Sequence, residues 1–310
     1  MTAPDDLGAA LRALVRWAPR GARALSAHAR RHPDGHVVEE ITLDGAAPDG
    51  PPLPGTLIRP DRPGPHPAVL YCHAHGGDYR LGRREMLEGS RFLQSPGYGP
   101  ALAASGFAAF CIDMPGFGDR RAEGTENDLA KAHLWQGHSL FGAMLNDQAA
   151  ALSYMAHRPD IDDARVFTLG LSMGAAHAWW LAALEPGIAG CVHLCMLADI
   201  APLIAAGAHA SHGFYLTVPG LLRHAETGDI AGLIAPRPQM ACHGGQDHLT
   251  PEPAREAALT RLRAAYARAP DALTCAIDPA AGHGETAPMR VAVLDFLAKA
   301  AAPGYPTFQS

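Results

Sequence analysis

Ser172 is the residue of this sequence best placed to act as a nucleophile. It lies in the segment GLSMG (residues 170–174), between a run of strand type and a helical run of small residues. A serine at a sharp strand-to-helix turn takes a strained backbone conformation that exposes its hydroxyl, and flanking glycines leave room for the neighbouring chain. The pattern predicts a nucleophilic serine, although a serine in an ordinary tight turn has the same sequence.

A serine hydroxyl becomes an effective nucleophile only when a histidine accepts its proton and a carboxylate orients that histidine. Two residues further along the chain are suited to these roles. Asp247 follows a predicted strand in GGQDHLTP, and His283 follows the next predicted strand in AAGHGET. The competing acids are Asp199, which is the second choice, and Asp278. Glu285 is better explained as a residue at the start of a helix.

Backbone N–H groups must hold the negative oxygen that forms when a serine attacks a carbonyl group. Met173 begins the helix after Ser172, so its amide is the first predicted donor. The second is expected in the loop HAHGGDY (residues 73–79), where glycines allow a close approach of the main chain. We expect the amide of His75 to be this donor, with Gly76 as the alternative.

The loop at residues 73–79 also allows an interpretation as a metal site. It is superficially similar to the HxHxDH motif of metallo-β-lactamase-type hydrolases, but Gly77 stands where that motif has its aspartate, and Asp78 stands where it has its last histidine. Further histidines near predicted strand ends are scattered, and such residues are more often surface or hydrogen-bonded side chains: His177, His193, His243 and His248. We therefore expect neither a metal nor another cofactor.

Strand-like and helical runs alternate along the chain and would position these residues. Predicted strands lie within residues 36–45, 55–60, 66–77, 106–120, 164–172, 187–197, 238–245 and 272–278, and predicted helices within 99–106, 140–157, 174–185, 253–269 and 285–300. Alternation predicts a parallel sheet covered on both faces, and the continuous apolar strands fit that burial. In such sheets the reactive groups lie at the carboxyl ends of the strands.

Two segments depart from the alternation. Residues 1–35 are expected to form an N-terminal helical extension, an amphipathic helix that packs on the body of the protein. The region from about 198 to 234 is apolar and interrupted by Gly and Pro, which predicts an inserted lid. The whole of residues 1–310 is expected to be one domain.

In DMPGFGDR (residues 113–120), Arg120 either holds an anionic substrate group or ties the loop to Asp113 or Asp119, and the structural role is favoured.

Composition excludes several classes of partner. A net charge of −6 offers no electrostatic reason for binding nucleic acid or an anionic membrane. The chain has no apolar run of the roughly 18 residues that a membrane crossing needs, and its amino terminus lacks the pattern of a secretory signal. The six cysteines form no CxxC pair and are interpreted as buried thiols, which suits a cytoplasmic protein. The sequence leaves the oligomeric state open.

The motifs GLSMGA, DMPGFGDR, LIAPRP, GGQDHLTP and GHGET resemble those of the α/β-hydrolase superfamily, in its dienelactone-hydrolase-like and acetyl-xylan-esterase-like branch. The resemblance covers roughly residues 68–298. It implies the α/β-hydrolase fold, with a mostly parallel central sheet, helices on both faces and a small inserted lid. It also implies the chain order serine, acid, histidine, which Ser172, Asp247 and His283 follow. The expected function is a cofactor-free serine esterase that cleaves a small carboxylic ester through an acyl-enzyme.

Two departures limit the resemblance. Dienelactone hydrolases carry a cysteine nucleophile where this chain has Ser172, and the related deacetylases usually have a glutamine at Met173 and RGQG where this chain has PGFG. The exact dienelactone reaction is therefore disfavoured, and an acetyl-sugar substrate is placed in doubt. The alternatives are a peptidase or carbon–carbon bond hydrolase that uses the same three residues, and a non-catalytic binding protein of the same fold.

Overall fold

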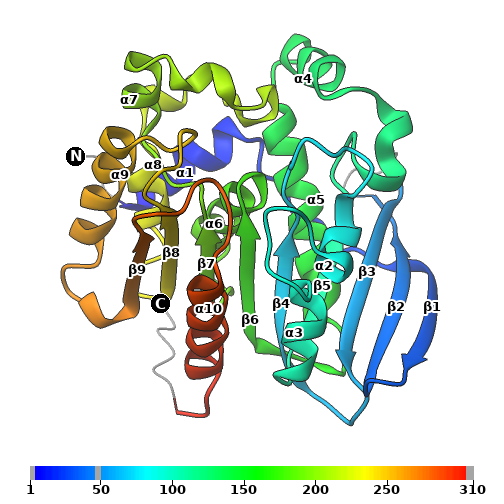
Figure 1. The fold of residues 1–310 in the computed structure, drawn as a ribbon. Helices are drawn as coiled ribbons and strands as arrows, with labels where there is room; N and C mark the ends of the chain where they lie inside the picture. The colour runs from blue at the N-terminus through cyan, green and yellow to red at the C-terminus, as the bar shows by residue number, and fades with distance from the viewer. Residues whose placement is uncertain (1–3, 46–49, 305–310) are drawn as a thin grey trace.

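A single nine-stranded sheet forms the centre of the protein in the computed structural model, which describes residues 4–45 and 50–304 (Figure 1). The strand order is β1-β2-β3-β5-β4-β6-β7-β8-β9. The strands are β1 (Ala24–His32), β2 (His36–Leu43), β3 (Leu53–Pro60), β4 (His66–Cys72), β5 (Ala108–Ile112), β6 (Ile161–Leu171), β7 (Gly190–Leu194), β8 (Gln239–Gly244) and β9 (Leu273–Asp278). The first three strands pair antiparallel, β3 meets β5 antiparallel, and every pairing from β5 through β4 to β9 is parallel. The expected mostly parallel sheet is confirmed.

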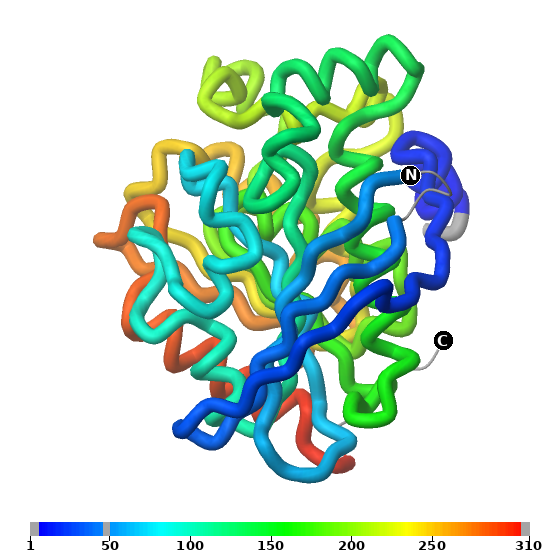
Figure 2. Tube along the Cα trace, turned by 90° about the vertical axis from the view of Figure 1, so that its right-hand side faces the viewer, coloured from blue at the N-terminus to red at the C-terminus, as the bar shows by residue number. Residues whose placement is uncertain are grey.

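Helices cover both faces of the sheet, as Figures 1 and 2 show. The longer helices are α1 (Pro4–Leu14), α3 (Tyr98–Ala104), α4 (Glu126–Trp135), α5 (Leu140–Ala156), α6 (Met173–Leu184), α9 (Glu252–Ala265) and α10 (Ala287–Ala300). Side chains of α1, α5, α6 and α9 share one buried apolar cluster, whereas those of α3 and α10 belong to a second cluster on the opposite face. Because both faces are covered, every residue of the central strands β5, β7 and β8 is buried, whereas the edge strand β9 is partly exposed.

Short helices and turns lie beyond the carboxyl ends of the strands. Residues 198–234 follow β7 and contain α7 (Ile200–Ala205) and α8 (Thr227–Gly232), joined by 3-10 turns. Figure 1 shows α7 and α4 at the upper end of the sheet. A four-residue helix, α2 (Glu85–Glu88), follows β4. Within residues 4–45 and 50–304, no helix combines the length and the hydropathy that a bilayer crossing requires.

The expectation for the amino terminus was partly wrong. Helix α1 ends at Leu14, and residues 24–32 form the edge strand β1 instead of continuing a helical extension to residue 35. Pro19 and Gly21 stand between the two elements and disfavour a longer helix. Every side chain of β1 is exposed, so the strand has no apolar alternation and is defined by its pairing with β2. The helix itself packs on the body as expected, because Leu11 is fully buried.

Helix α4 was not expected from the sequence. Its hydrophobic pattern is weak because only Glu126 and Ala130 are buried, yet Thr125 caps the helix by accepting a hydrogen bond from the amide of Asp128 at 3.2 Å. The interpretation of the cysteines is confirmed: all six are free thiols, and only Cys275 is not fully buried.

Candidate active site

Ser172 lies at the turn between β6 and α6 in the backbone conformation that the sequence pattern predicts. Its φ is 57° and its ψ is −117°, a strained region for a residue with a side chain. The flanking glycines are required by space. A Cβ on Gly170 would lie 2.3 Å from the backbone of Gly174, and a Cβ on Gly174 would lie 1.9 Å from the carbonyl oxygen of Cys72. The turn therefore fits only with glycines on either side of the serine.

The structure joins Ser172, His283 and Asp247 in one hydrogen-bonded chain. Nε2 of His283 lies 2.9 Å from the Oγ of Ser172, and Nδ1 lies 2.8 Å from Oδ2 of Asp247. The carboxylate is fully buried and the imidazole is 11% exposed at the side chain. Because an ionised carboxylate can only accept, Nδ1 carries the proton and Nε2 faces the serine hydroxyl as the acceptor. This arrangement allows proton transfer from Ser172 to His283.

The environment of Asp247 favours its ionised form. Burial would raise the pKa of this carboxyl, but hydrogen bonds and the charge of His283 outweigh it and hold the pKa below the ordinary value. Besides the imidazole, the amide of Leu249 donates at 2.9 Å and the hydroxyl of Thr250 donates at 3.0 Å. An ionised carboxylate can stabilise a protonated imidazole, as such a chain requires.

The other candidate acids have different partners. Asp199 accepts the amide of Gly228 at 2.9 Å and binds Arg261 at 2.8 Å, so it anchors α8 and α9 rather than the histidine. Asp278 accepts the amide of Ala280 at the end of β9. Glu285 directly precedes Thr286, the N-cap of α10, which agrees with its expected position at the start of a helix. It is buried, forms a salt bridge with Arg290, and accepts the amide of Gln94 at 2.8 Å.

Two peptide segments next to Ser172 offer free backbone N–H groups. Met173 is the first residue of α6, so its amide has no preceding helical carbonyl, and the positive end of the helix dipole lies behind it. In the loop after β4, the amide of Ala74 is already occupied by Glu85 Oε2 at 2.7 Å. The amides of His75 and Gly76 donate to no acceptor among the described residues. The amides of Met173 and His75, the expected donors to the negative oxygen, are therefore not occupied by described protein groups, and neither is the alternative donor at Gly76.

The histidines of this loop contact protein groups rather than converging on a metal site. His73 accepts the amide of Met114 at Nε2 and contacts the carbonyl oxygen of Ala74 through Nδ1. In the described part of the chain, the one group of three potential metal ligands combines Cys195 with Asp247 and His283, which already bond to each other. The HxHxDH similarity has no counterpart in the geometry.

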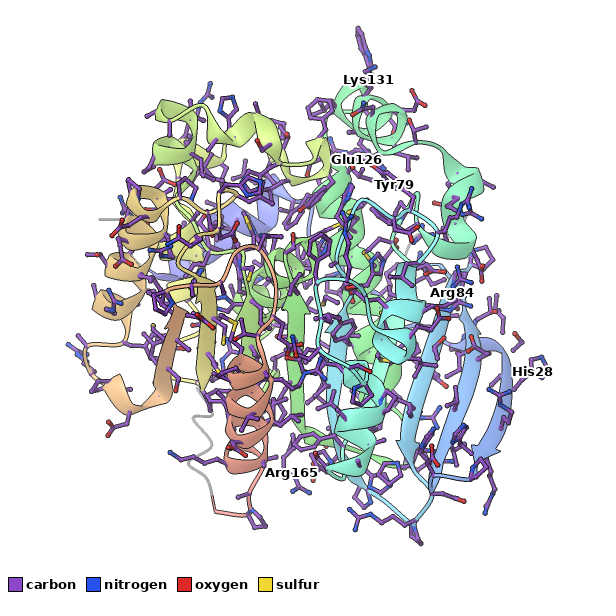
Figure 3. All side chains as sticks on the ribbon, in the orientation of Figure 1. His28, Tyr79, Arg84, Glu126, Lys131 and Arg165 are labelled. Carbon is purple, nitrogen blue, oxygen red and sulfur yellow. The ribbon has the colours of Figure 1, made fainter. Side chains whose placement is uncertain are left out.

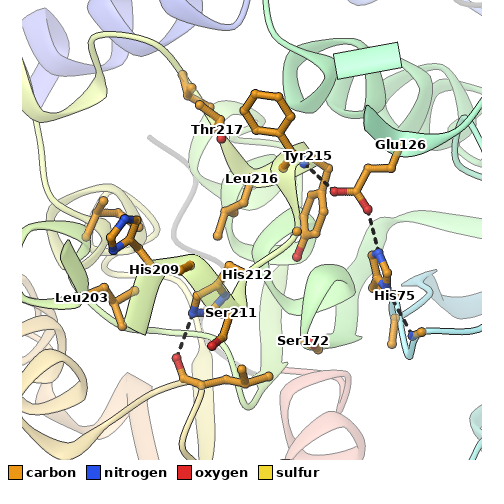
Figure 4. A pocket seen from close by; sticks show the side chains of 18 of the residues that line it. His75, Glu126, Ser172, Leu203, His209, Ser211, His212, Tyr215, Leu216 and Thr217 are labelled. Carbon is orange, nitrogen blue, oxygen red and sulfur yellow. Dashed lines mark hydrogen bonds and ion pairs between the residues drawn. The ribbon is translucent and has the colours of Figure 1, made fainter. Parts of the chain in front are cut away.

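A large pocket opens above Ser172 (Figure 4). Its volume is about 1160 Å³, and Ser172 and His283 both contribute to its wall. Residues 200–223, within the segment predicted as a lid, line much of the pocket, with apolar side chains at Leu203, Leu216 and Leu221. The remaining wall comes from the loop after β4, from the first residues of α4 and from Phe92 with its neighbour Arg91.

Glu126 connects three of the segments around this pocket. Its carboxylate accepts hydrogen bonds from Nε2 of His75 at 2.7 Å, from the hydroxyl of Tyr79 at 3.0 Å and from the amide of Tyr215 at 3.0 Å (Figures 3 and 4). Burial would raise the pKa of Glu126, but these donors lower it below the ordinary value. The pKa of Tyr79 is raised to about 12 by burial and by the nearby carboxylate. The carboxylate is therefore ionised and fully used by protein donors.

Sequence reasoning missed Glu126, although Thr125 and Asp128 formed a helix-start signal that could have located it. The structural role that the sequence favoured for Arg120 is confirmed, and Asp113 is one of its partners, because Nη1 of Arg120 donates to the carbonyl oxygen of Asp113 at 3.2 Å. Arg120 is buried and forms salt bridges with Glu123 at 2.6 Å and Asp147 at 2.7 Å, so it is structural. The side chain of Asp113, a predicted partner, instead pairs with Arg83, as does that of Asp119.

Comparisons with known proteins agree with this fold. The family described as alpha/beta hydrolase fold matches residues 67–207. The protein named "Putative hydrolase YtaP" from Bacillus subtilis (strain 168) is 38% identical over 267 residues, which cover 85% of this chain and 88% of that protein.

Two solved structures share the fold at low sequence identity. Acetyl xylan esterase from Paenibacillus sp. R4 has a TM-score of 0.69 at 19% identity, covering 96% of this chain and 94% of that chain. Glucuronoyl esterase from Solibacter usitatus has a TM-score of 0.69 at 14% identity, covering 94% of this chain and 91% of that chain. The family match and the 38% identity to the Bacillus subtilis hydrolase agree with the parallel sheet and the strained serine turn. The chain therefore belongs to the α/β-hydrolase family.

Proposed function

We propose that this protein is a serine esterase in which Ser172, His283 and Asp247 form the catalytic triad. The observation that carries the proposal is the position of His283. Its two ring nitrogens lie 2.9 Å from the serine hydroxyl and 2.8 Å from a buried carboxylate. The three residues come from three different strand ends, and within residues 4–45 and 50–304 they form a hydrogen-bonded chain of nucleophile, base and orienting acid beside the pocket.

The reaction proceeds in two steps. His283 accepts the proton of Ser172 as the hydroxyl oxygen attacks the ester carbonyl, and Asp247 stabilises the resulting imidazolium. The amides of Met173 and His75, or Gly76 in place of His75, hold the developing negative oxygen. His283 then protonates the leaving alcohol. A water molecule, activated by the same histidine, releases the acid and restores Ser172. The side chains and backbone amides that act in these steps all belong to this chain.

The substrate is a small-molecule carboxylic ester. Two solved structures with the same fold carry the names acetyl xylan esterase and glucuronoyl esterase, which supports ester substrates and includes esters of carbohydrates. The pocket of about 1160 Å³ exceeds the space that an acetyl group needs and lies somewhat above the usual range of volumes for small-molecule sites. We therefore expect at least one side of the ester to be bulky.

The experiment is labelling with a fluorophosphonate probe together with the kinetics of Ser172→Ala. The wild-type protein should be labelled at Ser172, and the variant should lose labelling and as much as roughly 10⁶-fold in kcat, because a triad fails as a unit. A folded Ser172→Ala variant that keeps its ester turnover would remove the assignment. Efficient turnover of a matched amide substrate would instead favour a peptidase.

A further inference from the structure

Arg91 places a positive charge beside the proposed catalytic groups. Its guanidinium stacks over the ring of Phe92, with 4.6 Å between Cζ and the ring centroid. That ring meets the imidazole of His283 edge-on, with 6.0 Å between the centroids. Nη2 of Arg91 also reaches the carbonyl oxygen of Gly76, in the loop that offers the oxyanion amides, at 3.4 Å. The guanidinium thus lies between the His283 loop and the loop after β4, in the pocket wall.

The backbone that presents Arg91 is held firmly. The carbonyl oxygen of Phe92 accepts the amide of Glu285 at 2.8 Å, two positions after His283. The amide of Gln94 donates to the Glu285 carboxylate at 2.8 Å, and its side-chain amide donates to the Glu285 carbonyl at 2.9 Å. These three bonds fasten the residues after Arg91 to the His283 loop. The cation is therefore presented from a fixed support, although its side chain is exposed.

The charges of the pocket are not balanced within the protein. Glu126 is the one carboxylate that lines the pocket among the described residues, and its oxygens are occupied by His75, Tyr79 and Tyr215. Arg91 has no carboxylate within ion-pair distance in residues 4–45 and 50–304, and its single protein acceptor is the carbonyl of Gly76. An unpaired guanidinium in a pocket of a chain with net charge −6 attracts an anion.

We propose that the site prefers esters that carry a carboxylate near the scissile bond, and that Arg91 is the residue that recognises this carboxylate. The planar fork of a guanidinium matches a carboxylate in geometry as well as in charge. The contact lies at an exposed rim, so it contributes a preference rather than an absolute requirement. The inference rests on the proposed function, because it concerns the substrate of the same serine.

The test compares anionic esters with neutral esters of almost the same shape. One pair carries the charge on the alcohol side, 3-acetoxybenzoate against 3-acetoxybenzamide. The other carries it on the acyl side, the 4-nitrophenyl monoester of adipic acid against the corresponding adipic monoamide ester. In the pair whose carboxylate lies on the side of the scissile bond that faces Arg91, we expect wild-type kcat/KM to be about three- to tenfold higher for the anionic ester than for the neutral one. That ratio should fall to about one in Arg91→Gln and below one in Arg91→Glu.

Arg84→Gln is the matched control. Arg84 is exposed and lies outside the pocket, and it has no carboxylate partner in the part of the chain that the structure describes, where it donates to the carbonyl oxygens of Leu81 and Arg80. Figure 3 labels Arg84 apart from Tyr79 and Glu126. The variant removes the same charge from the chain, and the wild-type ratio should persist in it. The wild-type preference should also shrink at 0.5 M salt, because exposed charges are screened.

Three results would overturn the inference: equal wild-type kcat/KM within both pairs, equal losses for both members in Arg91→Gln, or the same change of ratio in Arg84→Gln. Failure of the proposed function gives a different result. In that case the wild type would escape labelling at Ser172 or Ser172→Ala would keep its turnover, whatever the charge of the ester.

Discussion

His75 and Glu126 are 51 residues apart in the chain, and the imidazole Nε2 of His75 lies 2.7 Å from the Glu126 carboxylate. Because the carboxylate is ionised, Nε2 donates, and Nδ1 is left to accept the amide of Gly77 at 3.2 Å. Both ring nitrogens of His75 are thus bonded to protein groups other than Ser172. Its role is to hold the loop whose free amides face the site. Glu126 in turn ties that loop to α4 and, through Tyr215, to the segment over the pocket.

Glu126→Gln should lower kcat by about ten- to hundredfold with a smaller change in KM. The glutamine presents an NH₂ group or a weaker acceptor to His75, so the loop and its amides shift, and a displacement on the order of 1 Å can cost about 100-fold in rate. Steady-state kinetics with a neutral ester measures the effect.

Asp128→Asn is the control for that variant. Asp128 is exposed, and its substitution removes a charge of the same sign from the same helix. Its kcat should stay within about twofold of the wild type, since surface changes rarely disturb a structure. Equal losses in the two variants would mean that the charge of α4, and not the contact with His75, matters.

Asp247→Asn should lower kcat by about 10⁴-fold while the protein stays folded. An asparagine can donate to Nδ1 and select the wrong tautomer of His283, which then presents a proton to Ser172 instead of accepting one. Asp278→Asn should change kcat little, because that carboxylate accepts the turn amide of Ala280 and is not bonded to His283. Comparable kcat values for Asp247→Asn and Asp278→Asn would show that the acid has been assigned incorrectly.

Gly174→Ala should destabilise the protein by roughly 3 kcal/mol or more, measured by urea unfolding. Its Cβ would lie 1.9 Å from the carbonyl oxygen of Cys72, at the end of the neighbouring strand β4. Gly187→Ala is the matched change, because no atom lies within 4 Å of the Cβ position there. That variant should stay within about 0.5 kcal/mol of the wild type. Similar losses for the two alanines would contradict the steric explanation of the turn.

The protein should lose stability as the pH falls below about 6.5, the ordinary value of histidine. Burial lowers the pKa of His177 to about 3, of His193 to about 3 and of His243 to about 4. Between these values and 6.5 the unfolded chain binds protons that the folded chain does not, so each drop in pH favours unfolding. Each histidine should cost about 2 kcal/mol between pH 6.5 and pH 5.

His177→Phe tests this explanation. The phenyl ring should preserve the stacking on Phe141, whose ring centroid lies 4.9 Å from that of His177. The variant should lose about 2 kcal/mol less than the wild type between pH 6.5 and pH 5 in denaturant titrations. His28→Gln, at an exposed position of β1, should leave the slope unchanged. An identical slope in His177→Phe and the wild type would be incompatible with a neutral buried His177.

The residues around Ser172 were predictable because their signals are local. A continuous apolar strand, glycines at the turn and a helix of small residues are all visible within about twenty positions. The positions of Asp247 and His283 followed from the same kind of reasoning, since each stands directly after a predicted strand. A parallel sheet gathers its strand ends at one edge, so residues with those positions are expected to meet there.

Only the tertiary structure decided which of the expected groups touch and which unexpected ones join them. The choice of Asp247 over Asp199 rests on a contact across 36 residues, and the Ser172 contact of His283 spans 111. The edge strand β1 exists through its pairing with β2, because its exposed side chains leave no periodic pattern. Glu126 and Arg91 acquire their positions from segments folded against them. Local patterns arise from burial and backbone preference, whereas these partnerships depend on distances between chain segments that no local pattern records.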